Sequence, residues 1–217
     1  MATHSRASLG WNFVLRWMAA NAVGLTFGRI VGQLIGIMTG GIAVMLAGEA
    51  PGELVFVATI GAVIGMAIGL MQRVLLPQLI SLFRRWLLLS GAGWALGFAL
   101  ATSIASSLGA TIDKTAGELM SSAVVGASVG LAQWLSLRAW LPQAGWWIPV
   151  NVASWAIGPA LGGLMVDRLL ANLGAAWLTH AASGAVAGIL TGIVLNRMAQ
   201  PLAREGAVER AVDPRMR

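Results

Sequence analysis

The chain has 217 residues, of which 58% are hydrophobic and only 10% are charged, and its mean hydropathy is +0.80. Soluble domains carry about 25% charged residues, so this composition excludes an ordinary soluble domain and indicates an integral membrane protein. The net charge is +6, but no basic face with interleaved aromatic residues lies outside the apolar runs, and a nucleic-acid partner is therefore not expected.

Six apolar runs follow one another along the chain, and each is long enough to cross a bilayer core, which needs roughly 20 helical residues. The predicted spans are residues 17–46, 55–76, 86–108, 119–138, 147–167 and 179–198. The first run is too long for one straight span, so it tilts, kinks or protrudes. We therefore expect an all-α integral membrane protein with six transmembrane helices, forming a single domain over residues 1–217.

A pattern of Trp, Asn or Ser, Gly-x3-Gly and Gln or Thr occurs three times, each copy covering two successive runs. The copies are Trp17, Asn21, Gly65, Gly69 and Gln72; Trp86, Ser90, Gly126, Gly130 and Gln133; and Trp147, Asn151, Gly184, Gly188 and Thr191. The pattern predicts three repeated helical hairpins, at approximately residues 13–83, 84–145 and 146–200. A basic tail, residues 201–217, follows the last hairpin.

Arginine and lysine are distributed unevenly between the segments that join the spans. One side carries Arg6, Arg16, Arg73, Arg84, Arg85, Arg138, Arg197, Arg204, Arg210, Arg215 and Arg217, whereas the other carries Lys114 and Arg168. Because cytoplasmic segments hold the excess of positive charge, both termini and the tail are expected in the cytoplasm. The expected location is the bacterial inner membrane, with the lipid bilayer as the surrounding partner.

Glycines spaced four residues apart occur in all six runs, and the first run has five, at positions 24, 28, 32, 36 and 40. Helices in lipid associate through close backbone approach, which small residues permit. We therefore expect tight packing through Gly-x3-Gly faces. A glycine face that meets a ligand is the less favoured alternative.

The polar members of the repeat lie at matching depths in their helices. Asn21, Ser90 and Asn151 start the copies, and Gln72, Gln133 and Thr191 end them. We expect a hydrogen bond within each hairpin, from the Asn or Ser to the Gln or Thr, as a clamp between helices. If the hairpins surround a pseudo-threefold axis, these side chains instead converge on a small central cavity that faces the cytoplasm.

Arg29 and Gln33 complete the candidate intramembrane polar site. Arg29 lies twelve residues after Trp17, about 18 Å along a helix, near the middle of the bilayer, where a cation is costly and usually functional. Alternatively the first helix slides and Arg29 extends to an interface. The nearest carboxylates, Glu49 and Asp167, are expected near the outer face, so an anionic substrate or a lipid headgroup is a further candidate partner.

Two other kinds of side chain leave alternatives open. Trp94 and Trp155 occupy equivalent positions in the second and third copies, where they either wedge between hairpins or line an apolar ligand slot. His180 opens the last span and is either a hydrogen-bonded structural residue or a ligand of a metal or pigment. With His4 in a terminal segment and no cysteine, a zinc site has too few ligands, and neither a metal site nor a cofactor is expected.

The residues around Gly126-Ala-Ser-Val-Gly130-Leu-Ala-Gln133-Trp134, up to Arg138, are similar to a segment of small bacterial membrane proteins. That uncharacterised multi-span family shares repeated G-x3-G-x2-Q-W-x2-L-R segments followed by a Trp–Gly helix. The resemblance is clearest across residues 84–160. It implies the repeated membrane architecture, and no activity.

No catalytic constellation is recognisable, so an enzyme is not expected. One hypothesis is a non-catalytic scaffold or accessory subunit of a larger membrane complex or homo-oligomer, which predicts no sizeable internal cavity and an exposed stripe of small residues. The alternative is a carrier or binding subunit for a small apolar or anionic molecule. That hypothesis predicts a cavity reached by Arg29, Gln33, Gln72 or Gln133.

Overall fold

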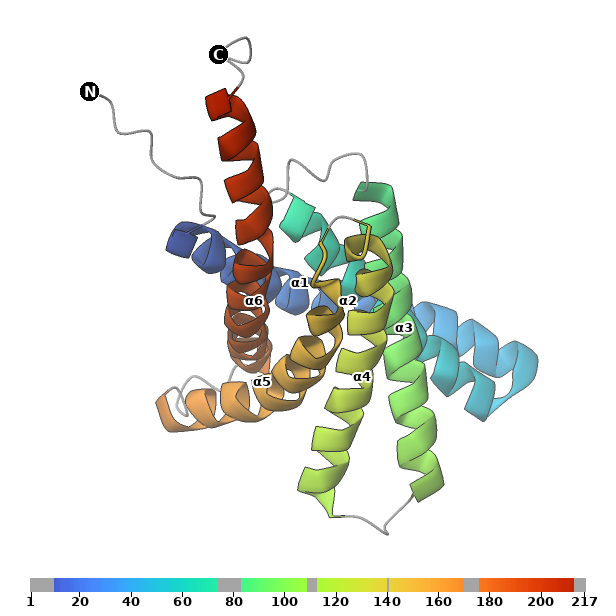
Figure 1. The fold of residues 1–217 in the computed structure, drawn as a ribbon. Helices are drawn as coiled ribbons and strands as arrows, with labels where there is room; N and C mark the ends of the chain where they lie inside the picture. Colours follow the sequence, from blue (N-terminus) through green and yellow to red (C-terminus); the bar gives the residue numbers. More distant parts are fainter. Residues whose placement is uncertain (1–9, 74–82, 109–112, 140, 170–175, 213–217) are drawn as a thin grey trace.

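The computed structural model describes residues 10–73, 83–108, 113–139, 141–169 and 176–212, and every regular element in these ranges is helical. Six long helices follow in order (Figure 1): α1 (Gly10–Ala47), α2 (Glu49–Arg73), α3 (Phe83–Leu108), α4 (Lys114–Leu137), α5 (Trp147–Leu169) and α6 (Ala176–Val212). A 3-10 turn, η3 (Ala144–Trp146), precedes α5.

Each of the six helices is long and apolar enough to cross a membrane, which confirms the prediction of a multi-pass, all-helical protein. Helices α2 and α4 begin five or six residues earlier than predicted, at Glu49 and Lys114, and the largest differences are at the two ends of the chain. Helix α1 begins at Gly10, earlier than predicted, and runs unbroken for 38 residues. Helix α6 continues to Val212, so most of the predicted tail extends the last helix, beyond the apolar segment that ends at Ala199.

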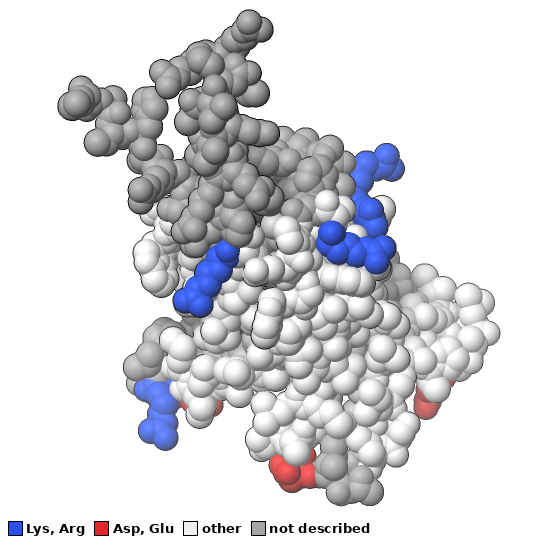
Figure 2. Space-filling model, viewed as in Figure 1, with Lys and Arg blue, Asp and Glu red and all other residues white. Residues whose placement is uncertain are grey.

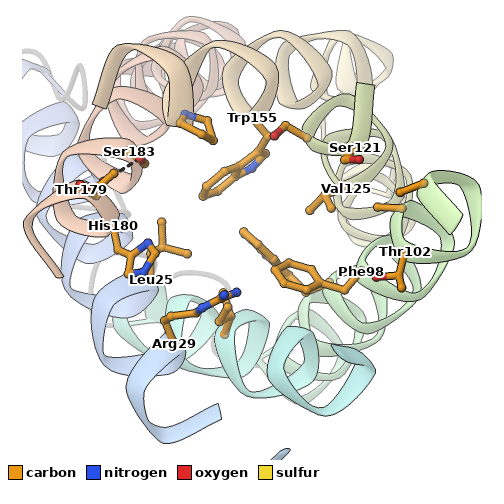
Figure 3. Close-up of a pocket in the computed structure, with 16 residues that line it drawn as sticks. Leu25, Arg29, Phe98, Thr102, Ser121, Val125, Trp155, Thr179, His180 and Ser183 are labelled. Atoms are coloured by element: carbon orange, nitrogen blue, oxygen red, sulfur yellow. Dashed lines mark hydrogen bonds between the residues drawn. The ribbon is translucent and has the colours of Figure 1, made fainter. Parts of the chain in front are cut away.

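The helices form a ring in chain order. Each helix packs against the next one, and α6 packs against α1 to close the ring. Figure 3 looks along the axis of this ring and shows helices on all sides of a central space. The far end of the α1–α2 pair projects sideways from the other helices (Figure 1).

Glycines lie where each helix meets the next one around the ring. A Cβ atom built on them would approach the neighbouring backbone too closely for a methyl group, because real Cβ contacts shorter than 3.0 Å are essentially never seen. The approaches are Gly24 to Ile68 Cα (2.7 Å), Gly61 to Trp94 O (2.5 Å), Gly97 to Val125 Cα (2.9 Å), Gly126 to Asn151 O (2.5 Å), Gly162 to Ser183 N (2.5 Å) and Gly184 to Asn21 O (2.7 Å). Close backbone contact therefore occurs at all six helix–helix interfaces.

Two aromatic clusters fill most of the ring's axis. The first contains Trp17, Trp86 and Trp147 with Leu137 and Met198, and it lies beside the helix ends that carry Arg84, Arg138 and Arg197. The second contains Trp94 and Trp155 with Ile64, Val129 and Ala187. Figure 2 shows most of the described Lys and Arg residues toward the upper side of the molecule and the Asp and Glu residues toward the lower side.

Candidate functional site

A belt of buried polar side chains crosses the ring between the two aromatic clusters. Every member is at most 4% exposed, and the belt consists of Asn21, Gln72, Ser90, Gln133, Asn151 and Thr191. These residues are the six polar positions of the repeat. The structure therefore brings all of them together, although each comes from a different one of the six helices.

Two of the three expected hydrogen bonds within hairpins are present, with the glutamine as the donor. Gln133 Nε2 donates to Ser90 Oγ at 3.0 Å, and Gln72 Nε2 donates to Asn21 Oδ1 at a long 3.4 Å. The third expected bond is replaced. The Thr191 hydroxyl donates to the carbonyl of Ala187, at 2.8 Å in its own helix, because a threonine side chain is too short to reach Asn151 and can bond the preceding turn.

A second set of hydrogen bonds joins consecutive hairpins, and the sequence reasoning missed it. The indole nitrogens of Trp86 and Trp147 donate to the side-chain oxygens of Gln72 and Gln133, at 3.1 and 2.9 Å. Trp17 donates to Thr191 Oγ1 at 3.0 Å across the closure of the ring. The repeated tryptophans are at most 5% exposed, and their hydrogen bonds hold neighbouring hairpins together.

The belt itself leaves almost no space. The cavity among these side chains measures about 10 Å³, which is close to the least volume that holds one water molecule. The alternative of a ligand cavity at the polar residues, facing the cytoplasm, is therefore not supported. The belt is a packed, hydrogen-bonded layer that closes the axis of the ring.

A much larger cavity lies on the other side of the second aromatic cluster and measures about 410 Å³. Side chains from all six helices line it (Figure 3), including Leu25, Ile64, Phe98, Ser121, Trp155 and His180. Trp94 and Trp155 meet edge to face at its wall, with ring centroids 4.6 Å apart. These two tryptophans thus pack against each other between hairpins and also line the cavity.

Arg29 extends from α1 into this cavity (Figure 3). Its Nε atom is buried and has no hydrogen-bond partner. Within the described residues no carboxylate lies within ion-pair distance of Arg29, so the expected candidates Glu49 and Asp167 do not pair with it. The ion pair found among these residues joins Lys114 and Glu118, and both of its side chains are exposed. A buried donor normally has a hydrogen-bond partner, either another group of the protein or a bound water molecule.

Gln33, the expected neighbour of Arg29, is exposed and does not line the cavity. The two residues are one helical turn apart, but the Gln33 side chain lies on an exposed part of α1, outside the set of residues that line the cavity. His180 instead shares the cavity with Arg29, a proximity that α6 creates by packing on α1. In the described part of the chain, no three His, Asp or Glu side chains form a group that could hold a metal ion, and His4 lies outside it.

A second hollow of about 640 Å³ adjoins the cavity at the start of α4. Asp113, Lys114 and Glu118 line it, and the two hollows share Arg29, Ala105, Ser121, Ser122 and Pro159. The Arg29 side chain therefore stands between an apolar cavity and a space lined by charged residues.

No family model matches the chain, and comparisons with the curated proteins and with the solved structures find no match either.

Proposed function

We propose that this protein is a non-catalytic membrane protein that binds a small apolar or anionic molecule in the cavity beside Arg29. The observation that carries the proposal is the unpartnered Arg29 side chain in a space of about 410 Å³. Small-molecule sites have volumes of about 300–1,000 Å³ and are mostly apolar with a few polar groups. An ionisable residue inside a membrane protein is usually functional.

The proposal includes an arrangement in the membrane. Three repeated hairpins associate through Gly-x3-Gly faces in a bacterial inner membrane, with lipid around the ring, as in the family that the sequence resembles. The arginine-rich helix ends face the cytoplasm, in agreement with the positive-inside rule. The cavity then opens toward the opposite side, where Asp113 and Glu118 lie.

A scaffold or accessory subunit of a larger complex or homo-oligomer is the second candidate. Its support is the outer half of α1, where Met45 and Leu46 are more than 80% exposed and a Cβ atom at Gly41 would meet nothing within 4 Å. That hypothesis predicts no sizeable internal cavity. The binding hypothesis requires one, and we favour it because the ring contains a cavity of about 410 Å³.

Native mass spectrometry of the protein released from a mild neutral detergent tests the binding proposal. Ala105 lines the cavity and the adjoining hollow, whereas its neighbour Ser106 lines neither. We expect a retained small molecule on the wild-type chain and on Ser106→Trp, and its loss from Ala105→Trp, whose indole would project from the wall where the cavity meets the hollow. A wild-type chain without an adduct, or an adduct that Ala105→Trp keeps, would overturn the proposal.

A further inference from the structure

We propose that the ligand is an amphiphilic anion with a single apolar chain, whose carboxylate or phosphate headgroup binds Arg29 and whose chain lies in the cavity against Phe98 and Trp155. This inference rests on the proposed function and narrows it to one chemical class. It combines the two properties, apolar and anionic, in one molecule with a fixed orientation.

The position of Arg29 defines where the headgroup lies. Arg29 lines both the apolar cavity and the charged hollow, so its guanidinium stands at the boundary between them. The formal charges around the hollow are balanced, because Arg29 and Lys114 line it together with Asp113 and Glu118. A headgroup at this boundary can bind the guanidinium and remain in contact with the polar hollow.

The polar groups in the cavity wall suit an anion. Among the described residues that line the cavity there is no Asp or Glu, whereas Thr102, Ser121 and Ser122, on other parts of the wall, supply hydroxyl donors. A guanidinium binds planar or tetrahedral oxyanions through paired hydrogen bonds, and bonds to charged groups are the stronger ones. The unpartnered Nε of Arg29 is a donor that such a headgroup would satisfy.

The rest of the cavity suits one apolar chain. Its walls include Leu25, Ile64, Trp94, Phe98 and Trp155. The space ends at the second aromatic cluster, because the polar belt beyond that cluster is packed. A molecule that enters from the charged hollow therefore stops inside the ring, so the site binds its ligand from one side and is not a continuous pore.

Binding of three probes in neutral detergent, measured by native mass spectrometry, tests the inference. Decanoate has the headgroup and the chain, decanol lacks the charge, and acetate lacks the chain. We expect decanoate to bind the wild-type protein at least about tenfold more tightly than either of the others, since a hydrogen bond to a charged group is worth about 1.5–3 kcal/mol. If either decanol or acetate binds the wild-type protein as tightly as decanoate does, the inference is wrong.

Two substitutions complete the test. Arg29→Gln should weaken decanoate binding at least about tenfold and leave decanol binding unchanged, whereas Arg84→Gln, on an exposed position at the other end of the ring, should change neither. Decanoate binding that survives Arg29→Gln would contradict the inference. The proposed function would still stand in that case, because the cavity would remain a site for a small molecule.

Competition with dioleoyl phosphatidic acid distinguishes a soluble amphiphile from a membrane lipid as the source of the headgroup. We expect this two-chain lipid not to displace decanoate, since a cavity of about 410 Å³ suits one chain. Displacement would contradict the single-chain part of the inference and assign the site to bilayer lipid.

Discussion

The indole nitrogen of Trp147 donates a hydrogen bond to the side-chain oxygen of Gln133, fourteen positions earlier in the chain, at 2.9 Å. The same glutamine donates to Ser90, so one buried side chain joins its own hairpin internally and also joins it to the next hairpin. Gln72 makes the equivalent pair of bonds with Trp86 and Asn21. Through these bonds the Gln that ends one copy of the repeat and the Trp that begins the next copy pack as one unit.

Replacing Trp147 with Phe should lower the free energy of unfolding by about 1–3 kcal/mol, because the Gln133 oxygen would lose its donor while it stays buried. Thermal unfolding in detergent, followed as Tm, measures the effect. Trp146→Phe is the matched control, since Trp146 is 66% exposed. Equal Tm values for the two variants would show that the hydrogen bond does not stabilise the ring.

Gln133→Thr introduces the residue that the third copy of the repeat has at the equivalent position, Thr191. It should lower the stability by about 0.6–1.7 kcal/mol, the usual value of one hydrogen bond between membrane helices, because a threonine cannot reach Ser90. Thr191 shows that a threonine at this position still accepts from a tryptophan. The control is Gln143→Thr, on an exposed residue before η3, and a similar loss of Tm in both variants would contradict the prediction.

Gly184→Ala should weaken the contact that closes the ring. Its Cβ atom would lie 2.7 Å from the Asn21 carbonyl oxygen and 2.9 Å from Ala22 Cα, so α6 and α1 must move apart, at a cost of about 1–3 kcal/mol. The loss of Tm should be absent from Gly41→Ala, where the added atom meets nothing within 4 Å. If the Tm of Gly184→Ala equals that of the wild-type protein, α6 and α1 do not pack this closely.

The proposed topology can be tested directly because the chain has no cysteine. Arg85→Cys and Glu118→Cys place single thiols on exposed positions at opposite ends of the ring. In intact cells a membrane-impermeant maleimide should label the cysteine at 118 and leave the one at 85 unlabelled until the membrane is opened. The reverse pattern would place the charged hollow in the cytoplasm.

The sequence predicts the six helices well because each apolar run is long enough to cross a bilayer core. The hydrogen-bond partners of the polar residues in the repeat are harder to predict. Spacing places Gln72 and Asn21 in one hairpin, but it does not indicate that Trp86 of the next hairpin also reaches Gln72. The equal distance of fourteen residues from Gln72 to Trp86 and from Gln133 to Trp147 is the signal that could have revealed the bridge.

The cavity could be predicted only in part. Arg29 stands out in the sequence because a cation is rare in an apolar run. His180, in contrast, reaches the same cavity only because α6 closes on α1, and nothing local in the sequence indicates that contact. Gln33 shows the opposite error, since it is one helical turn from Arg29 but its side chain is exposed and does not line the cavity.

An experimental structure of the protein in lipid nanodiscs, with decanoate added, tests the central claim most directly. We expect density for an elongated molecule between the Arg29 guanidinium and Trp155, inside a closed ring of six helices. An empty cavity, or Arg29 paired with a side chain of the protein itself, would contradict the claim that this site binds an anionic amphiphile.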